Sequence, residues 1–405
     1  MHLLYIATNF GSLTHTFIAR EVTALRERGV TVDLLALRPA RKAQAAAPEC
    51  DLTGCRYVFP VPWWRVVTAG LGLAIRRPGR WSRAVRVALG SPGDGLITRL
   101  KLLGQLAVSA TAVRTVESLR PDLMHAHLAN PPGSYAMFLS LLTGIPYSFT
   151  AHAADLYRRP VGNRAKLIHA AGAVAISRYN LDHYRTLVPG YDRSAIVHCG
   201  VRPEDFPFRR REAAGPLGIL AVGRAVPKKG FGDLLTALAR LTAAGVAWRG
   251  QLVGGGPLLA DLRARRDELG LTSLEITGPL QQPEVRRLLD AADVFVLPCV
   301  PAADGDVDGI PVSLMEAMAA GCPVVSTRVS GIPELLDDGR AGLLVAPHAP
   351  EELAAALARL ATEPGLAAEL GHRGHERICE EFDVRREAVK LETFFAQLRG
   401  RRTVC

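Results

Sequence analysis

The chain has 405 residues, 48% of them hydrophobic, and a formal net charge of +10. This length exceeds what one hydrophobic core usually supports and predicts two domains. Its seven cysteines are scattered and include no C-x-x-C pair, which argues against a disulfide framework or a cysteine-bound metal. No charge-free apolar run reaches about 18 residues, and the N-terminus lacks the pattern of a signal peptide. We therefore expect a cytoplasmic protein with reduced thiols.

The positive charge is concentrated between Trp63 and Arg120, where ten Lys or Arg residues stand against two acids. The same stretch contains Trp64 and Trp81 among many leucines, valines and alanines. It either docks on the anionic inner face of a membrane, with the tryptophans at the headgroups, or forms a solvated basic helix face. No nucleic-acid partner is expected, because aromatic residues make up only 6% of the chain and no recognition module is present.

Short β-branched runs alternate with longer amphipathic stretches, the pattern of parallel strands joined by crossover helices. In the first half, strands are predicted at residues 2–7, 30–36, 121–125, 146–150, 173–176 and 195–198. In the second half, strands are predicted at residues 217–222, 249–253, 274–277, 293–297, 323–326 and 342–345. Each set predicts its own doubly wound sheet.

The two predicted sheets divide the chain into domains at residues 1–200 and 217–383. Between them, residues 201–216 are rich in Pro, Gly and charge and are predicted to be a linker. Residues 384–405 follow the second domain and contain one last amphipathic helix. In open α/β sheets ligands bind beyond the carboxyl ends of strands, so functional residues are expected directly after strands.

Three aspartates, at 304, 306 and 308, precede a short helix and suggest a metal site. A calcium loop of this pattern needs a glutamate where Met315 stands, and Glu316 is one residue late. A D-x-D pair holding a divalent cation on a nucleotide-sugar diphosphate is a second, weaker interpretation. The stronger one is an anion site, because Pro311 suits a helix start and leaves the next N–H groups free for a phosphate.

Two further motifs follow predicted strands in the second half. The stretch "VGRAVPKKGF" supplies Arg224 and Lys229, a planar guanidinium and a compact cation that together suit a diphosphate. It is not a Walker loop, since no G-K-[ST] is present. The stretch "LVGGGPL" places three glycines after a strand, where a backbone could approach a nucleotide closely.

In the first half, Gly11 and Ser12 follow the first strand and could let a donor phosphate or sugar approach the backbone. Further along lie the histidines of "MHAHLANPPGS" and "FTAHAADLY", which could build a zinc site. The favoured interpretation makes His125 a hydrogen-bonded core residue. His127 and His152 are then expected at strand exits, facing the cleft.

The chain resembles the retaining glycosyltransferases of the GT-B fold, the family 4 type with its Glu-x7-Glu motif. "VDGIPVSLMEAMAAGCPVV" is similar to that motif, "VGRAVPKKGF" to the G-R-x-x-x-x-K-G element and "VGGGPL" to the G-x-G-P turn. "TAHAADLY" resembles the histidine motif of the first domain. Within the family the chain looks most like the exopolysaccharide and colanic-acid-type transferases.

The resemblance implies an α/β protein with two Rossmann-like doubly wound domains facing across a cleft, the first for the acceptor and the second for the nucleotide sugar. The last helix, 384–400, would cross back to brace the first domain. The implied donor is a UDP- or GDP-sugar, the acceptor is a glycan or a lipid-linked glycan, and neither a metal nor another cofactor is required.

The resemblance also implies roles for single residues. Glu316 would bind the ribose, Arg224 and Lys229 would hold the diphosphate, and His152 would lie by the donor sugar and the acceptor. Asp308 stands where the family has its first glutamate and would act in catalysis near the hydroxyls of the donor sugar, although its side chain is one methylene shorter. His127 and Asp155 are assigned to the acceptor. The donor-binding residues are Gly11, Ser12, Gly223, Arg224, Lys229, Gly254, Gly256, Gly278, Leu280, Gly309, Ile310, Val312, Ser313 and Glu316.

Retention follows from the resemblance alone, and no carboxylate is placed as a covalent nucleophile of the kind that glycosidases use. A same-face attack, with the departing phosphate as base, is therefore the preferred mechanism. The alternatives are a sugar-nucleotide epimerase of the same fold, a transferase for a soluble small molecule, and a binding protein without catalysis.

Overall fold

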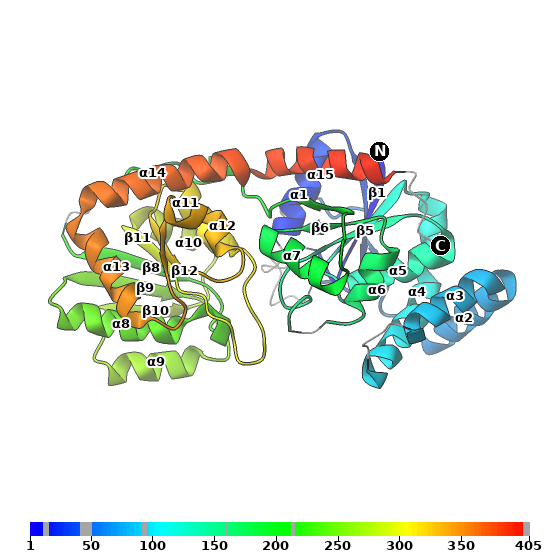
Figure 1. The fold of residues 1–405 in the computed structure, drawn as a ribbon, viewed down its shortest axis with the longest axis horizontal. Coiled ribbons are helices and arrows are strands. Elements are labelled where there is room, and N and C mark those ends of the chain that lie inside the picture. The colour runs from blue at the N-terminus through cyan, green and yellow to red at the C-terminus, as the bar shows by residue number, and fades with distance from the viewer. Residues whose placement is uncertain (11–15, 41–50, 91–94, 159, 212–214, 400–405) are drawn as a thin grey trace. The chain divides into compact units, whose positions relative to one another are not determined.

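The computed structural model describes residues 1–10, 16–40, 51–90, 95–158, 160–211 and 215–399. The chain forms two compact units, one of residues 1–198 with 384–405 and one of residues 199–383. Each unit is a parallel sheet with helices packed on it (Figure 1). The predicted α/β class, with two doubly wound sheets, is confirmed.

The sheet of the first unit is entirely parallel, with strand order β3-β2-β1-β4-β5-β6-β7. Its strands are β1 (His2–Ala7), β2 (Thr31–Ala36), β3 (Arg56–Tyr57), β4 (Leu123–His127), β5 (Tyr147–Ala151), β6 (Gly172–Ala175) and β7 (Ser194–Ile196). Every residue of β4, β5 and β6 is buried, because helices cover both faces of the central strands. The order reverses between β1 and β4, which is where such sheets bind ligands.

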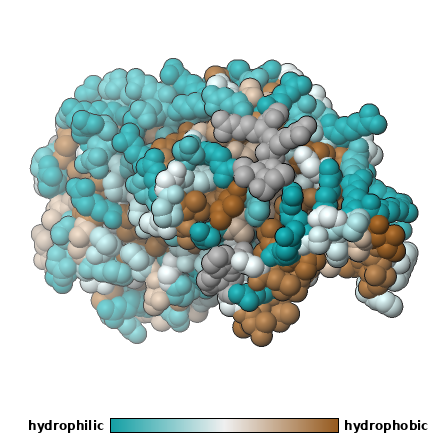
Figure 2. All heavy atoms as spheres, turned by 45° about the vertical axis from the view of Figure 1, so that its right-hand side comes forward, coloured by the Kyte–Doolittle hydropathy of each residue, from teal (hydrophilic) through white to brown (hydrophobic). Residues whose placement is uncertain are grey.

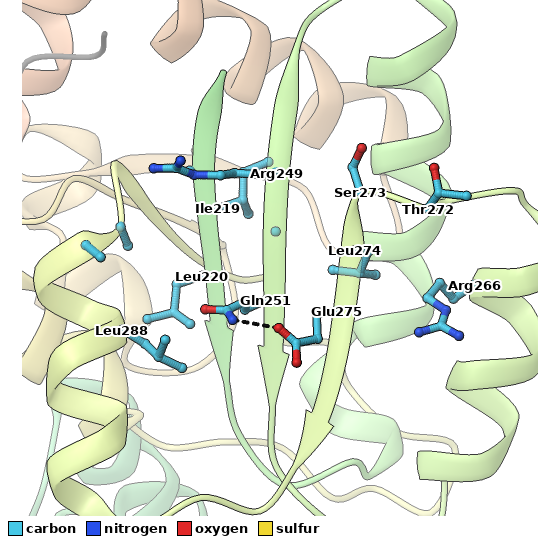
Figure 3. Close-up of a pocket in the computed structure, with 14 residues that line it drawn as sticks. Ile219, Leu220, Arg249, Gln251, Arg266, Thr272, Ser273, Leu274, Glu275 and Leu288 are labelled. Carbon is cyan, nitrogen blue, oxygen red and sulfur yellow. Dashed lines mark hydrogen bonds between the residues drawn. The ribbon is translucent and has the colours of Figure 1, made fainter. Parts of the chain in front are cut away.

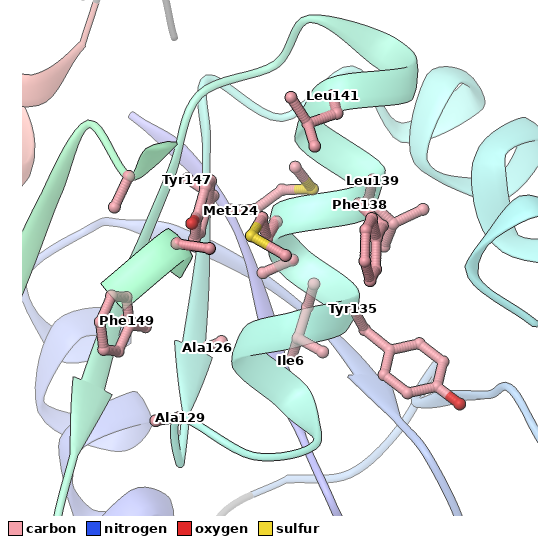
Figure 4. Packing of buried hydrophobic residues seen from close by; sticks show 14 of the residues in the cluster. Ile6, Met124, Ala126, Ala129, Tyr135, Phe138, Leu139, Leu141, Tyr147 and Phe149 are labelled. Carbon is pink, nitrogen blue, oxygen red and sulfur yellow. The ribbon is translucent and has the colours of Figure 1, made fainter. Parts of the chain in front are cut away.

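Helices of the first unit fall on the two sides of this sheet. They are α1 (Thr16–Glu27), α2 (Trp63–Arg76), α3 (Pro78–Gly90), α4 (Leu96–Leu119), α5 (Pro132–Thr143), α6 (Asn163–His169), α7 (Arg178–Leu187) and α15 (Val384–Leu398). Helix α5 is buried over eleven of its twelve residues, and in Figure 4 Met124 and Tyr147 of the strands lie on one side of it and Phe138 on the other. That burial makes α5 the central helix of this core.

The other core of the first unit joins α1 and α15, although more than 350 residues separate them. Helix α15 buries Val384, Ala388, Leu391, Phe395 and Leu398, a three-and-four spacing that places them on one face. A side chain at position 172 would lie 2.7 Å from Phe394, so a glycine there lets the helix approach β6.

The second unit has a parallel sheet of order β10-β9-β8-β11-β12-β13. Its strands are β8 (Leu217–Val222), β9 (Trp248–Val253), β10 (Leu274–Gly278), β11 (Val294–Leu297), β12 (Val324–Thr327) and β13 (Leu343–Val345). Its helices are η2 (Pro203–Asp205), η3 (Pro227–Lys229), α8 (Phe231–Ala243), α9 (Leu259–Glu268), α10 (Gln282–Ala291), α11 (Val312–Ala319), α12 (Ile332–Leu335), η4 (Asp337–Gly339), α13 (Pro350–Thr362) and α14 (Pro364–Glu381).

The segment before β8 packs on the second unit. Val201 bridges Asp383, Phe206 is buried, and the guanidinium of Arg211 donates to the carbonyl oxygens of Asp290 and Leu289. The start of the second unit is thereby tied to its own end and to α10.

Candidate active site

In the second unit, the predicted donor residues come together at the carboxyl edge of the sheet. Gly223 and Arg224 follow β8, Gly254 and Gly256 follow β9, and the loop to α11 follows β11. Because β8 pairs with both β9 and β11, these turns are neighbours. The strand order reverses between β8 and β11, so the turns lie at the switch point that binds ligands in open α/β sheets.

The glycine turn after β9 is built against the turn after β8. Gly254 has φ +145°, and a Cβ there would lie 1.7 Å from the carbonyl oxygen of Gly223. A Cβ on Gly256 would lie 2.5 Å from the carbonyl oxygen of Ala225, whose N–H donates to Gly255 at 2.9 Å. The glycines are therefore required by the approach of two backbones within the protein. Their predicted contact with a nucleotide stays a prediction.

A buried charge cluster joins η3 to the loop after β11. The ammonium of Lys229 lies 2.8 Å from Oδ2 of Asp308, and that of Lys228 lies 3.3 Å from Oδ1 of Asp308 and 3.0 Å from Oδ1 of Asp306. The side chains of Lys229 and Asp308 are only 12% and 14% exposed. Asp308 therefore holds Lys229 in place beside Arg224.

The salt bridges of this cluster determine the pKa values of its side chains. Burial by itself would raise the pKa of Asp308, but the two lysines lower it to about 2. Burial would lower the pKa of Lys229, and Asp308 outweighs that effect and raises it. Burial and the neighbouring carboxylate raise the pKa of Cys299 far above the usual range, so its thiol stays protonated and donates to Asp308 at 3.3 Å. Cys299 is thus no nucleophile at neutral pH.

The same pairing bears on the acidic loop. Asp306 and Asp308 already face lysine ammonium groups, and the carboxylate of Asp304 accepts from the N–H of Asp306 at 3.1 Å. A cation bound in this loop would have to compete with the ammonium of Lys228 for the carboxylates of Asp306 and Asp308. The arrangement favours a structural role for the loop.

Helix α11 begins directly after Pro311, where the sequence predicts a helix start. The hydroxyl of Ser313 donates to the carbonyl oxygen of Val222 at 3.2 Å, which joins the first turn of α11 to the end of β8. Glu316 lies one turn into the helix and is half-buried, whereas Gly309 and Ile310 are buried. Gly278 ends β10 and is buried, and Leu280 two residues later is half-buried.

In the first unit, His125 is a core residue, as predicted. It is fully buried, and its two ring nitrogens lie 2.8 Å from the hydroxyl of Ser148 and 3.0 Å from that of Thr150. Burial lowers the pKa of His125 to about 3, so the ring is neutral at physiological pH.

His127 is the last residue of β4, the strand exit predicted for it, and it is buried, with 1% of its side chain exposed. Its Nε2 lies 2.8 Å from Oε1 of Glu21, which also accepts from the hydroxyl of Tyr5 at 2.7 Å. Its Nδ1 lies 3.3 Å from Nε2 of His152. Glu21, His127 and His152 thus form a hydrogen-bonded chain from the core to the turn after β5.

Glu21 was missed by the sequence reasoning. It stands among Ile18, Val22 and Leu25, the i, i+4, i+7 face of α1 that packs into the core. An acidic residue on the apolar face of a predicted helix is the sequence signal that could have identified Glu21 as a buried, paired group. Burial would raise its pKa, but contact with His127 outweighs this and lowers it, so Glu21 is ionised.

Asp155, predicted at the acceptor, has its carboxylate directed at the backbone. It accepts from the N–H groups of Ala129 at 2.6 Å, His152 at 3.1 Å and Ala153 at 3.0 Å. This cap fixes the turn that carries His152. Gly11 and Ser12 lie outside the described residues.

Glu21, His125 and His127 each offer one metal-ligand atom, and these atoms lie within 4.8 Å of one another. Both ring nitrogens of His125 already have hydroxyl partners. A metal there would have to displace one of these hydrogen bonds.

A cavity of about 730 Å³ lies in the second unit, away from the motif residues. It is lined by residues of β8, β9, β10 and α10, among them Arg249 and Leu288 (Figure 3). Gln251 and Glu275 cross it with a hydrogen bond of 2.8 Å. It contains none of the predicted donor residues and is therefore distinct from the candidate site.

Two family models match consecutive parts of the chain. Residues 14–200 match the glycosyl transferase 4-like domain, and residues 216–363 match glycosyl transferases group 1. Together they cover both units.

One curated relative is similar over nearly the full length and another over about half of it. The glycosyltransferase WcaL of Escherichia coli K12, named for colanic acid biosynthesis, is 31% identical over 96% of this chain and 99% of its own. The amylovoran biosynthesis glycosyltransferase AmsK of Erwinia amylovora is 36% identical over 52% of this chain and 53% of its own.

Solved structures share the fold at lower identity. Sucrose-phosphate synthase of Thermosynechococcus elongatus is 18% identical, with a TM-score of 0.73 over 98% of this chain and 99% of its own. HepE of Anabaena, solved in complex with UDP, is 16% identical, with a TM-score of 0.71 over 98% of this chain and 100% of its own.

Proposed function

Because the chain belongs to the glycosyltransferases, with a 4-like domain followed by a group 1 domain, we propose that it transfers a sugar from a nucleoside-diphosphate sugar to an acceptor hydroxyl. The supporting observation is the gathering of Arg224, Lys229 and the start of α11 at the switch point of the second sheet.

Arg224 and Lys229 divide the work on the diphosphate. Arg224 is exposed and makes no ion pair with any residue that the structure describes, so its guanidinium can face two phosphate oxygens. Lys229 is held by Asp308, which is the role that we propose for this aspartate. The first N–H groups of α11, at Val312 and Ser313, add donors of the kind that anions meet at helix starts.

Catalysis on this proposal is electrostatic. As the bond from the anomeric carbon to the diphosphate breaks, negative charge grows on the leaving phosphate, and fixed cations and N–H donors stabilise it there. The acceptor oxygen attacks from the same face, its proton passes to the departing phosphate, and the configuration is retained. Glu316 binds the ribose hydroxyls, and His152 lies beside the transferred sugar.

The His152 side chain is positioned by the chain of hydrogen bonds behind it. An ionised Glu21 accepts from Nε2–H of His127, which leaves Nδ1 of His127 as acceptor for Nε2–H of His152. This order fixes the ring orientation and tautomer of His152 without a metal. Gly11 and Ser12 remain proposed donor contacts, and His127 and Asp155 act on the acceptor side through the turn that they support.

The acceptor is proposed from the relatives. WcaL and AmsK are named for colanic acid and amylovoran biosynthesis, so we assign this chain to the synthesis of a cell-surface polysaccharide, on a lipid-linked acceptor at the cytoplasmic face of the membrane. A sugar-nucleotide epimerase of the same fold and a transferase for a soluble small molecule are the alternatives.

A panel of UDP- and GDP-sugars tests the donor. One donor should raise the thermal transition of the chain, since a ligand that binds the folded state stabilises it. With a polysaccharide repeat-unit acceptor it should then yield a glycoside of retained configuration, with or without EDTA. An epimer formed without acceptor would favour the epimerase. If no nucleotide sugar stabilises the chain, the proposed donor class is overturned. If EDTA abolishes activity and one divalent ion restores it, the proposed independence of metal is overturned.

A further inference from the structure

Helix α2 carries an apolar stripe that faces solvent. Trp63, Val67, Leu71 and Ile75 follow one another at a spacing of four, and their exposed fractions are 77%, 49%, 60% and 80%. Residues spaced four apart lie on one side of a helix. In a soluble domain this side would normally face a core, so the stripe calls for a partner.

A second exposed apolar group begins the neighbouring helix α4. Leu96, Ile97 and Leu100 are 72%, 70% and 58% exposed. Figure 2 shows hydrophobic patches on the lower part of the forward face of the molecule. Among the described helices, α4 alone is long and apolar enough to cross a membrane, and 33% of its apolar window is buried. Its later turns pack on α5, α2 and α3, so α4 belongs to the fold of the first unit.

Between α2 and α4 lies a cavity of about 500 Å³ with an unusual charge. Four arginines and one acid line it: Arg65, Arg76, Arg77, Arg114 and Glu117. Glu117 pairs with Arg77 at 2.5 Å. Within the described part of the chain, the other three arginines make no ion pair. The cavity therefore offers three positive charges to an anion.

We propose that the layer of α2, α3 and α4 docks on an anionic lipid bilayer, with the apolar stripe in the interface and a lipid phosphate in the arginine cavity. Tryptophan at the start of α2 and aliphatic side chains along it suit the boundary between headgroups and acyl chains. The arginines suit a phosphate, which they bind through paired N–H donors.

The combination favours a bilayer over other anionic partners. A nucleic acid would meet the arginines but leave Leu71 and Ile75 in water. An acidic protein surface would place carboxylates, which prefer water, against the same aliphatic stripe. An anionic bilayer satisfies both because its charge lies in a plane directly above its apolar core.

The test uses the full chain and sedimentation with vesicles of phosphatidylcholine, alone or with anionic phosphatidylglycerol. The chain should sediment with the anionic vesicles at low salt, less at high salt, and weakly with phosphatidylcholine alone. Leu71→Ser with Ile75→Ser, and separately Arg76→Gln with Arg114→Gln, should each lower the affinity at least tenfold. All four side chains are on the surface, so the thermal transition should not change.

The matched control is Arg249→Gln with Arg287→Gln, which removes the same charge from exposed positions of the second unit. Its vesicle binding should equal that of the unchanged chain. Three results would overturn the proposal: no binding to anionic vesicles at low salt, equal losses in the control and the α2–α4 charge variant, or self-association that the apolar variant abolishes while vesicle binding persists. Transfer activity plays no part in the readout, so failure here leaves the proposed function standing.

Discussion

Replacing Asp308 with asparagine removes one charge from a buried cluster and keeps its shape. An aspartate ordinarily has a pKa of about 3.9, and the lysines lower that of Asp308 to about 2. A tenfold change in the acid dissociation constant corresponds to about 1.4 kcal/mol, so the ionised carboxylate stabilises the fold by about 2 to 3 kcal/mol. The value applies to a side chain that is 14% exposed, where solvent screening is small.

The sign of the pH dependence follows from the direction in which the pKa moves. Because the folded pKa is the lower one, the unfolded chain takes up the proton first as the pH falls. The stabilising contribution is therefore complete above about pH 5 and is lost as the pH falls from about 4 through 2. Asp308→Asn should be less stable at pH 7 and should approach the unchanged chain toward the acid end.

Calorimetry of the full chain measures the stability that Asp308→Asn loses. In a domain of this size, 1 kcal/mol shifts the transition temperature by about 2–4 °C, so Asp308→Asn should lower the transition of the second unit by about 5–10 °C at pH 7. Asp304→Asn is the matched control, since that side chain is exposed in the same loop. If the two variants melt within about 2 °C of each other, Asp308 does not hold Lys229 by its charge.

Four other outcomes are expected. Arg224→Lys should lower kcat at least about tenfold, because an ammonium cannot bind two phosphate oxygens side by side, and steady-state kinetics would reveal a smaller effect. Gly254→Ala should cost about 3 kcal/mol or more in urea unfolding, since its Cβ would lie 1.7 Å from a carbonyl oxygen, whereas Gly255→Ala, with 3.4 Å to its nearest neighbour, should cost less than about 1 kcal/mol. Glu21→Gln should lower kcat about tenfold or more with little change in KM for the donor, because it removes the charge behind the histidine pair; an unchanged kcat would show that the pair is only structural. His125 has a pKa of about 3 in the folded chain, so its contribution to the free energy of unfolding is complete above about pH 6.5 and falls by about 2 kcal/mol by pH 5. A His125→Gln variant should lack this fall, and an equal loss of stability in the variant between pH 7.5 and 5 would contradict the assignment.

Most of the fold could be predicted from hydrophobic runs. Strands that are largely buried appear in the sequence as short apolar runs, and all twelve predicted strands coincide with strands of the structure to within about two residues. Strand β3 was missed because it has two residues, both exposed, and no periodicity marks so short an edge strand.

The site was harder to predict, because its contacts depend on which turns become neighbours. The motifs named Arg224, Lys229 and Asp308, but no spacing in the sequence indicates that a lysine at 229 meets an acid 79 residues later. The same holds for Glu21 and His127, which α1 and β4 bring together across 106 residues. Pairing of this kind is a property of the strand order and not of local sequence.

Helix α15 has a consequence for how the protein is made. Apart from α15, the strands and helices of the first unit are translated by residue 198. Leu391 and Phe395 of α15, which complete its second core, are translated only after the whole second unit. Until then α1 and the sheet face beside it lack their cover and expose apolar surface. The second unit can close as soon as residue 383 has emerged, so the domain that is translated first is the one that finishes folding last.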